Sequence, residues 1–271
     1  MSEHHEPVGS VGVRVERSGT VAVVWMVRPE RRNAVTPALG RALVRTLREL
    51  DVDPAVRAIV LAGEGPAFCA GADLSILAEG PEALNAFAED HQLRDLAIAP
   101  VLMDTPVATA VQGAAAGAGF VLAIAGDTTF VAPDVRLIPV FPRIGLVAEY
   151  GVAWLLPRRV GSARAADILL TGREIDADTA VAWGLANDVA SDPVARAVEW
   201  AREVAACSPF SVATAKRQLI DAAHQSLAEA HAESLRLMRE SFAGPDLPEA
   251  LLARQEKRDP VFSARLMQDV D

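Results

Sequence analysis

The chain has 271 residues, a formal net charge of -10 and two cysteines. This length is enough to bury a sizeable core in one large domain or two small ones. The negative charge repels nucleic-acid phosphates and argues against a nucleic-acid partner. Cys69 and Cys207 lack metal-ligand spacing and no signal peptide is recognisable before them, so we expect a cytoplasmic protein without a metal site.

Two segments could be taken for functional elements, but their composition argues against this. Residues 1–10 are polar and contain His4 and His5, and we predict a disordered leader without function. Residues 107–126 carry no charge and approach the length of a membrane span. Glycines interrupt this stretch and most of its apolar residues are alanine, so we predict a buried strand, turn and helix, and no membrane partner.

Strand and helix signals alternate through the first part of the chain. Residues 20–27 and 56–62 are rich in β-branched side chains and bounded by Gly or Pro, as is typical of strands; residues 106–111 and 127–132 add two more. Between the first two, Thr36 is a plausible N-cap and leucines then recur at helical spacing. The alternation predicts an α/β fold with a largely parallel sheet covered on both faces.

The later part of the chain is predicted to be mainly helical, with an amphipathic stretch from residue 208 to 242 that needs its own core or a partner subunit. A turn at 244–250 precedes a final helix ending near Lys257. We divide the chain into a core over residues 11–190 and a helical C-terminal region over 191–271. Helices are expected to open at Ser162, Asp176, Asp192 and Ser208.

Two short glycine turns, at residues 68–73 and 112–119, each follow a predicted strand. Their small residues let backbone amides approach a ligand closely, and the second lies where a helix begins and its first N–H groups are unpaired. Two such turns can converge on one carbonyl oxygen and form an oxyanion hole. The alternative is that both are only tight packing turns between strand and helix. For either turn taken alone, this is the favoured interpretation.

Both turns belong to a series of six segments: RPERRNAV (28–35), GPAFCAGADL (65–74), AVQGAAAGAGFVLAIAGD (110–127), IGLVAEYGVAWLLPRRVG (144–161), LTGREIDADTAVAWGLAND (170–188) and EKRDPVF (256–262). With these segments in this order, the chain resembles the crotonase, or enoyl-CoA hydratase/isomerase, superfamily over residues 13–262. The resemblance implies a crotonase-like spiral of ββα turns with a helical C-terminal trimerisation region, forming a trimer or a dimer of trimers.

The resemblance also implies an acyl-CoA substrate, with coenzyme A as part of the substrate and no other cofactor. Its thioester oxygen is expected to bind the backbone N–H groups of Ala70 and Ala118, the second at a position where the family more often has Gly. Asp73 is expected to stabilise its turn. The other expected coenzyme A contacts are Ala34, Gly71, Ala72 and Leu74, with Arg28, Arg31 or Arg32 and Lys257 or Arg258 as phosphate candidates, the last two from a neighbouring subunit.

Hydratases of this superfamily carry two glutamates that activate water and protonate the α-carbon. At the matching positions this chain has Val121 and Phe141, which cannot transfer protons. Each missing group costs a factor of roughly 10² to 10⁴ in rate. The chain therefore resembles an isomerase-like branch lacking both hydratase glutamates, with Val121 and Phe141 lining a dry substrate pocket.

Glu149 matches a position where isomerase branches have Asp or Glu, and one carboxylate is enough to shift a double bond. A dry pocket would raise its pKa. The alternative is that Glu149 caps a helix starting near Gly151. His91 is expected on a surface helix, Tyr150 is expected to pack, and a helix over residues 77–99 is expected to shape the acyl pocket.

The leading hypothesis is an isomerase that moves a double bond in an enoyl- or dienoyl-CoA with Glu149 as the proton shuttle. The first alternative is an enoyl-CoA hydratase that works by a non-standard route. The second is a crotonase homologue that binds acyl-CoA without catalysis.

Overall fold

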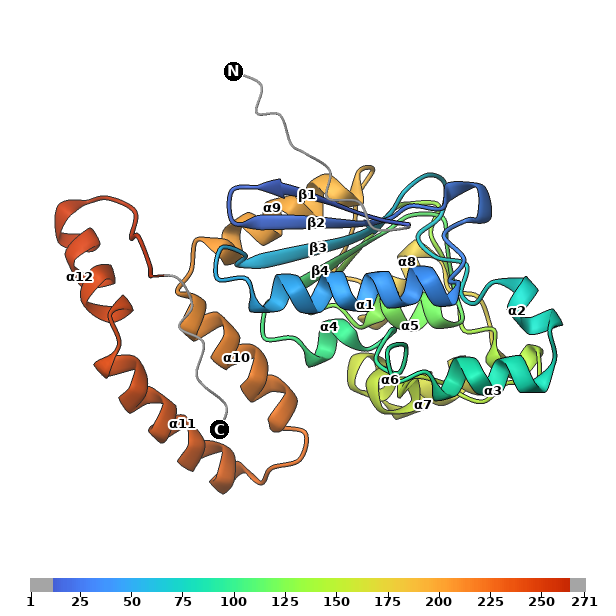
Figure 1. The fold of residues 1–271 in the computed structure, drawn as a ribbon. Helices are drawn as coiled ribbons and strands as arrows, with labels where there is room; N and C mark the ends of the chain where they lie inside the picture. Colours follow the sequence, from blue (N-terminus) through green and yellow to red (C-terminus); the bar gives the residue numbers. More distant parts are fainter. Residues whose placement is uncertain (1–11, 264–271) are drawn as a thin grey trace, which may run out of the picture.

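The computed structural model describes residues 12–263, without the side chains of Leu74 and Leu77 (Figure 1). The predicted leader over residues 1–10 lies outside this range. The helices are α1 (Pro37–Val52), α2 (Leu74–Ala78), α3 (Pro81–Glu89), α4 (Ala99–Leu102), α5 (Ala118–Ile124), α6 (Val152–Val160), α7 (Ser162–Thr171), α8 (Ala177–Trp183), α9 (Pro193–Ala205), α10 (Pro209–Asp221), α11 (Leu227–Ala243) and α12 (Asp246–Glu256), with 3-10 turns η1 (Pro29–Arg31) and η2 (Phe141–Arg143).

A six-stranded sheet forms the centre of the core. Its strand order is β1 (Val13–Ser18), β2 (Val21–Met26), β3 (Ala58–Gly63), β4 (Val107–Val111), β6 (Thr128–Val131) and β8 (Asp188–Val189). The edge strand β1 is antiparallel to β2, and the other pairings are parallel. The predicted largely parallel sheet is therefore confirmed, although β1 and β8 were not predicted.

Both faces of this sheet are buried, because alternate strand residues point to opposite sides. Val24 and Leu61 belong to the larger core cluster, which also contains Leu43 of α1. Val23 and Val60 point the other way, into a second cluster that α9 completes with Ala197, Ala201 and Ala205. Helix α9, which follows the predicted boundary at residue 190, therefore covers this face of the sheet and packs with the core.

A second, smaller layer of paired strands accounts for the predicted spiral of ββα turns. Strands β5 (Ala114–Ala116) and β7 (Arg136–Ile138) pair in parallel, and single bridges extend the ladder to Cys69 on one side and Ile175 on the other. The chain thus repeats one unit, a strand in the large sheet followed by a short pairing in the small layer and a helix, as in β4, β5 and α5. Stacking these units brings turns from distant parts of the chain side by side.

The predicted helix over residues 77–99 is interrupted. It consists of α2, α3 and a series of turns before α4. Gly80 has φ 92 and Pro81 follows it, a combination that ends one helix and starts the next. His91 accordingly lies in a turn after α3 rather than on a helix.

Helices α10, α11 and α12 form an arm that projects from the core (Figure 1). Of the four expected helix starts, Asp176, Asp192 and Ser208 cap α8, α9 and α10 with their side chains. Helix α7 begins at Ser162 as predicted, but its N-cap is Gly161 and no side chain caps it. The turn predicted at 244–250 is shorter, because α12 already begins at Asp246. Within residues 12–263, no helix is both long enough and apolar enough to cross a membrane.

A buried ion pair joins the arm to the core. Lys216 of α10 is 6% exposed and lies 2.8 Å from the Asp127 carboxylate. Its ammonium also donates to the carbonyls of Pro100 and Thr105 at 2.8 and 3.1 Å. All three donor positions are therefore used, and the middle of α10 is fixed against α4 and the segments that precede β4 and β6.

We expect Lys216→Met to lower the free energy of unfolding by about 3 kcal/mol, the low end for breaking a buried ion pair. Asp127 loses its ion-pair partner and keeps the bond from Val107 N–H, and two carbonyls lose a donor. Urea denaturation measures this change. Arg239→Met, at an exposed position of α11, is the control and should change stability by less than about 0.5 kcal/mol. Equal stability of the two variants would contradict the anchoring role.

Candidate active site

Residues 69–73 of the first glycine turn are held between two segments of backbone. On one side Cys69 pairs with β5: its N–H donates to the Ala114 carbonyl at 3.1 Å, and its carbonyl accepts from Ala116 at 2.9 Å. On the other side residues 32–35 run alongside the turn, with an isolated parallel bridge between Val35 and Ala72. Each amide of the turn therefore points to one of two sides.

The amide of Ala70 is already engaged, because its N–H donates to the Arg32 carbonyl at 2.9 Å. It points to the side opposite β5. The expectation that Ala70 supplies an oxyanion donor is therefore corrected, since a donor that must first break a backbone hydrogen bond is not preorganised.

Ala72 supplies the free amide instead. Val35 donates to Gly71 O at 2.7 Å and accepts from Asp73 N–H at 2.9 Å, so its bonds flank Ala72 as in a parallel ladder. The Ala72 N–H consequently points away from Val35. Among the hydrogen bonds of residues 12–263, none has the Ala72 N–H as donor.

The second glycine turn places Ala118 beside the first. Ala118 is the first residue of α5, and its N–H likewise donates to no acceptor in the described chain. A Cβ added to Gly71, which has φ +87, would lie 2.7 Å from Ala116 O and 3.7 Å from Ala118 N. A Cβ on Gly119 would lie 2.2 Å from Cys69 O. Glycine is therefore required at both positions for the turns to meet.

Asp73 closes the first turn. Its carboxylate accepts from the Ser75 N–H at 2.9 Å and the Ser75 hydroxyl at 2.8 Å, and it pairs with Arg28. These contacts, the Ser75 amide first and the Arg28 guanidinium next, hold the pKa of Asp73 well below its usual range. Arg28 also donates to the Ala34 carbonyl at 3.0 Å. Its guanidinium is thus committed to the turn, which leaves Arg28 a poor phosphate ligand.

The structure places the other expected contacts unevenly. Val121 and Phe141 are 0% and 2% exposed and belong to the core cluster, so neither presents surface to a ligand here. Arg32 is exposed beside the first turn. Lys257 ends α12 on the arm, at the opposite end of the molecule from α2 (Figure 1). The Leu74 side chain lies outside the described part of the structure.

Glu149 precedes α6 and is half-buried. Helix α6 starts with Gly151 as N-cap and no side chain caps it; only the Glu149 carbonyl accepts a bond, from Val152 at 3.1 Å. The alternative that the Glu149 side chain caps this helix is therefore wrong. Its carboxylate forms no hydrogen bond or ion pair with the described residues, and burial raises its pKa.

Tyr150 follows Glu149 in the chain and is half-buried. It packs against the core cluster, as predicted, with a left-handed backbone at φ 50. Burial first, then the charge of Glu149 and the Cys69 sulfur, raise the pKa of its phenol to about 12. Cys69 itself is a buried thiol whose pKa burial raises to about 11, and it donates to the Asn33 carbonyl at 3.3 Å.

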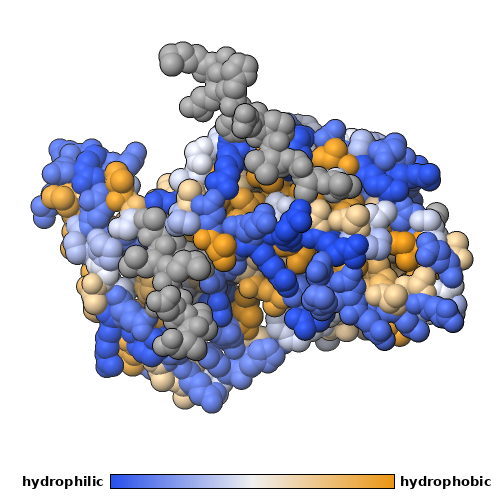
Figure 2. Space-filling view, in the orientation of Figure 1, coloured by the Kyte–Doolittle hydropathy of each residue, from blue (hydrophilic) through white to orange (hydrophobic). Residues whose placement is uncertain are grey.

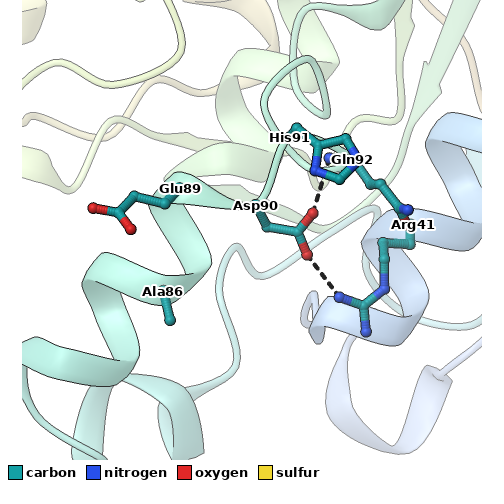
Figure 3. Close-up of a pocket in the computed structure, with 6 residues that line it drawn as sticks. All are labelled: Arg41, Ala86, Glu89, Asp90, His91 and Gln92. Carbon is teal, nitrogen blue, oxygen red and sulfur yellow. Dashed lines mark hydrogen bonds and ion pairs between the residues drawn. The ribbon is translucent and has the colours of Figure 1, made fainter.

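A separate surface depression lies between α1 and the end of α3 (Figure 3). Its volume is about 580 Å³, and Arg41 pairs with Asp90 across it at 2.7 Å. His91 lies at its rim and is exposed, so this predicted surface residue takes no part in the site built above. No three His, Cys, Asp or Glu side chains gather as a metal site anywhere in residues 12–263.

Comparison with known proteins identifies a family for the chain that contains these two turns. The enoyl-CoA hydratase/isomerase family model matches residues 16–265. The chain belongs to this family. It is therefore an acyl-CoA-processing family member, and the neighbouring turns with unused amides are its candidate enolate-binding site.

Proteins similar to this chain are named either as enoyl-CoA hydratases or as an isomerase. A Mycobacterium bovis protein named "Probable enoyl-CoA hydratase echA6" is 35% identical over 252 residues, covering 92% of this chain and 98% of that protein. The Escherichia coli 1,2-epoxyphenylacetyl-CoA isomerase is 30% identical over 251 residues, covering 90% and 95%. The crystal structure of a Bacillus anthracis enoyl-CoA hydratase matches with TM-score 0.89 and 27% identity, covering 94% and 100%. The crotonase-like fold is therefore established.

Proposed function

We propose that the protein is an acyl-CoA isomerase that shifts a double bond in an enoyl- or dienoyl-CoA. The observation that carries the proposal is the Glu149 carboxylate, which is half-buried, unpaired among the described residues and raised in pKa. A free carboxylate whose pKa is raised by burial suits the uptake and return of a proton. The free amides of Ala72 and Ala118 supply the oxyanion donors.

The chemistry is a two-step proton transfer. Glu149 removes a proton from the α-carbon of a 3-enoyl thioester, and the electron pair moves into the carbonyl to give a dienolate. The Ala72 and Ala118 N–H groups bind the oxygen on which this charge appears, with each donor contributing a few kcal/mol. Protonated Glu149 then returns the proton to the γ-carbon, which leaves the double bond conjugated with the thioester.

The two glutamates that hydration by the family's usual route requires are absent from this chain. Val121 and Phe141 are buried hydrocarbon side chains and transfer no protons. The Escherichia coli relative is named an isomerase of an epoxide thioester, which supports isomerisation as a reaction class, whereas the hydratase names of other relatives favour the alternative of hydration by a non-standard route. A protein that binds acyl-CoA without catalysis is the remaining alternative.

A substrate panel separates these three possibilities. Purified protein is incubated with 3-enoyl-, dienoyl- and 2-enoyl-CoA thioesters, and products are separated by chromatography. Conversion of 3-enoyl- or dienoyl-CoA to a positional isomer supports the proposal. Loss of 2-enoyl-CoA alone establishes the hydratase instead, and coenzyme A thioester binding without turnover establishes a binding protein.

For the coenzyme A phosphates we propose Arg32 and Lys257, neither of which forms an ion pair with any other described residue. Arg258, by contrast, is committed to Glu249 and Glu256. Lys257 lies on the arm, so it serves this role from a neighbouring subunit. A cytoplasmic location stays a prediction.

The arm also supports the proposed trimer or dimer of trimers. Leu219, Leu227 and Phe242 are 80%, 87% and 60% exposed, and apolar surface shows among the charged residues of the arm in Figure 2. Helices with this much apolar surface need a partner. We expect light scattering to give three or six times the 28.7 kDa chain mass. A monomer at micromolar concentration would contradict this, and Phe242→Asp should shift the equilibrium toward smaller species.

A further inference from the structure

Asn33 uses both polar atoms of its side chain in hydrogen bonds beside the first turn. It is 0% exposed, in the left-handed conformation with φ 55. Its side-chain oxygen accepts from Arg28 N–H at 2.8 Å, and its amide nitrogen donates to the carbonyls of Glu64 and Ala67 at 3.0 and 2.8 Å. Its backbone carbonyl accepts from the Cys69 thiol at 3.3 Å.

These bonds join two loops that are distant in sequence. One loop, residues 28–35, contains Asn33. The other, residues 64–67, leads directly into the turn that presents Ala72. Asn is among the few residues besides Gly that adopt the left-handed conformation readily, and its amide both donates and accepts. Asn33 therefore meets the backbone and side-chain requirements of this position together.

The loop that Asn33 fixes is the one that aligns the turn. The Arg32 carbonyl, one residue before Asn33, accepts from Ala70, and Val35, two residues after it, bonds to Gly71 and Asp73 on either side of Ala72. A shift of this loop moves all three bonds and therefore the direction of the Ala72 N–H. Asn33 itself has no free polar group left for a ligand.

We propose that Asn33 is a positioning residue for the Ala72 oxyanion donor, acting through the loop at residues 28–35. This inference rests on the oxyanion hole of the proposed function. An effective donor lies 2.7–3.1 Å from the developing oxyanion, and a misplacement of about 1 Å costs about 100-fold in rate. The effect of Asn33 can therefore be measured as the polarisation of the thioester carbonyl of a bound acyl-CoA, before any reaction takes place.

The test replaces the Asn33 amide and measures that polarisation. In Asn33→Asp the two donors facing the Glu64 and Ala67 carbonyls become an acceptor, so the loops separate. Infrared spectroscopy of bound butyryl-CoA, labelled with ¹³C at the thioester carbonyl, reports the strength of the oxyanion hole. We expect the wild-type protein to lower the carbonyl frequency and the variant to lose most of this shift.

The same variant should lose turnover while it keeps its affinity for the thioester. We expect kcat for the isomerisation to fall about 10- to 100-fold while the Kd for butyryl-CoA changes less than threefold. The matched control is Asn187→Asp: Asn187 is exposed and uses only its acceptor oxygen, toward Thr129 N–H at 2.9 Å, which Asp retains. Asn33→Gly keeps the left-handed backbone and removes the tether, so it serves if Asn33→Asp does not fold.

The outcomes are distinguishable. A carbonyl shift that persists in both Asn33 variants overturns the positioning role and leaves the proposed function intact. A wild-type protein that binds butyryl-CoA without any shift overturns the oxyanion hole and the inference with it. A wild-type shift that is lost in the variants supports the inference even if the panel of unsaturated thioesters gives no isomerisation.

Discussion

Glu149→Gln is expected to lose between about 10² and 10⁴ of the isomerisation rate, the range for removing a general acid–base group. The substitution keeps the size and polarity of the side chain but removes its ability to accept and return a proton. Since Glu149 caps no helix and pairs with no described residue, the fold should not change. The measurement is kcat for conversion of a 3-enoyl-CoA to the conjugated 2-enoyl-CoA, followed by absorbance.

The pH profile provides an independent check of the same group. Burial raises the pKa of Glu149 above its ordinary value of 4.5. The shuttle must be deprotonated to start the reaction, so kcat/KM should rise with pH through a value above 4.5 and then level off. Glu149→Gln should lack this limb, and Glu203→Gln, on an exposed face of α9, should keep both rate and profile. Full activity in Glu149→Gln would remove the proposed mechanism.

Much of the fold follows from local patterns in the sequence. The helix α1 begins where Thr36 and Pro37 predict, and the Thr36 hydroxyl accepts from Leu39 N–H at 3.2 Å. Strands β2, β3 and β4 consist of residues that suit a buried sheet. In these segments propensity, spacing and capping agree, so the tertiary fold adds little that the sequence does not already indicate.

Other elements depend on contacts that sequence does not display. Strand β5 is three alanines, a residue depleted in strands, and its conformation comes from pairing with β7. The amphipathic pattern of α9 is the same whether it packs on a sheet or on another helix. Only the structure shows that Ala197 and Ala201 lie against the large sheet.

The candidate site shows the same limit at the level of single amides. Composition identified the first glycine turn, but Ala70 and Ala72 have the same side chain and differ only in where their N–H groups point. That direction is set by the register with Arg32 and Val35, some 37 residues earlier, and by the left-handed Gly71. Sequence spacing contains neither the register nor the φ angle, so it could not choose between the two amides.

Ala118→Pro is expected to lower kcat by about 10²- to 10³-fold, the cost of removing one oxyanion donor. Proline has no N–H, and the substitution therefore deletes the donor at its source. The position tolerates it: Ala118 is the first residue of α5, where proline costs no helical hydrogen bond. Gly117 before it has φ 53 and ψ -120 and no Cβ to clash with the proline ring. Steady-state kinetics and the Kd for a saturated acyl-CoA measure the effect.

Ala118→Gly is the matched control, because it changes the same side chain and keeps the N–H. The two variants separate the backbone donor from the methyl group of Ala118, which is 8% exposed. If the donor matters, the glycine variant keeps its rate within about threefold while the proline variant, which lacks the N–H and has its ring Cδ in that place, loses kcat. Equal losses in both would assign the effect to packing at this turn. A proline variant as active as the wild type would show that enolate charge is stabilised elsewhere.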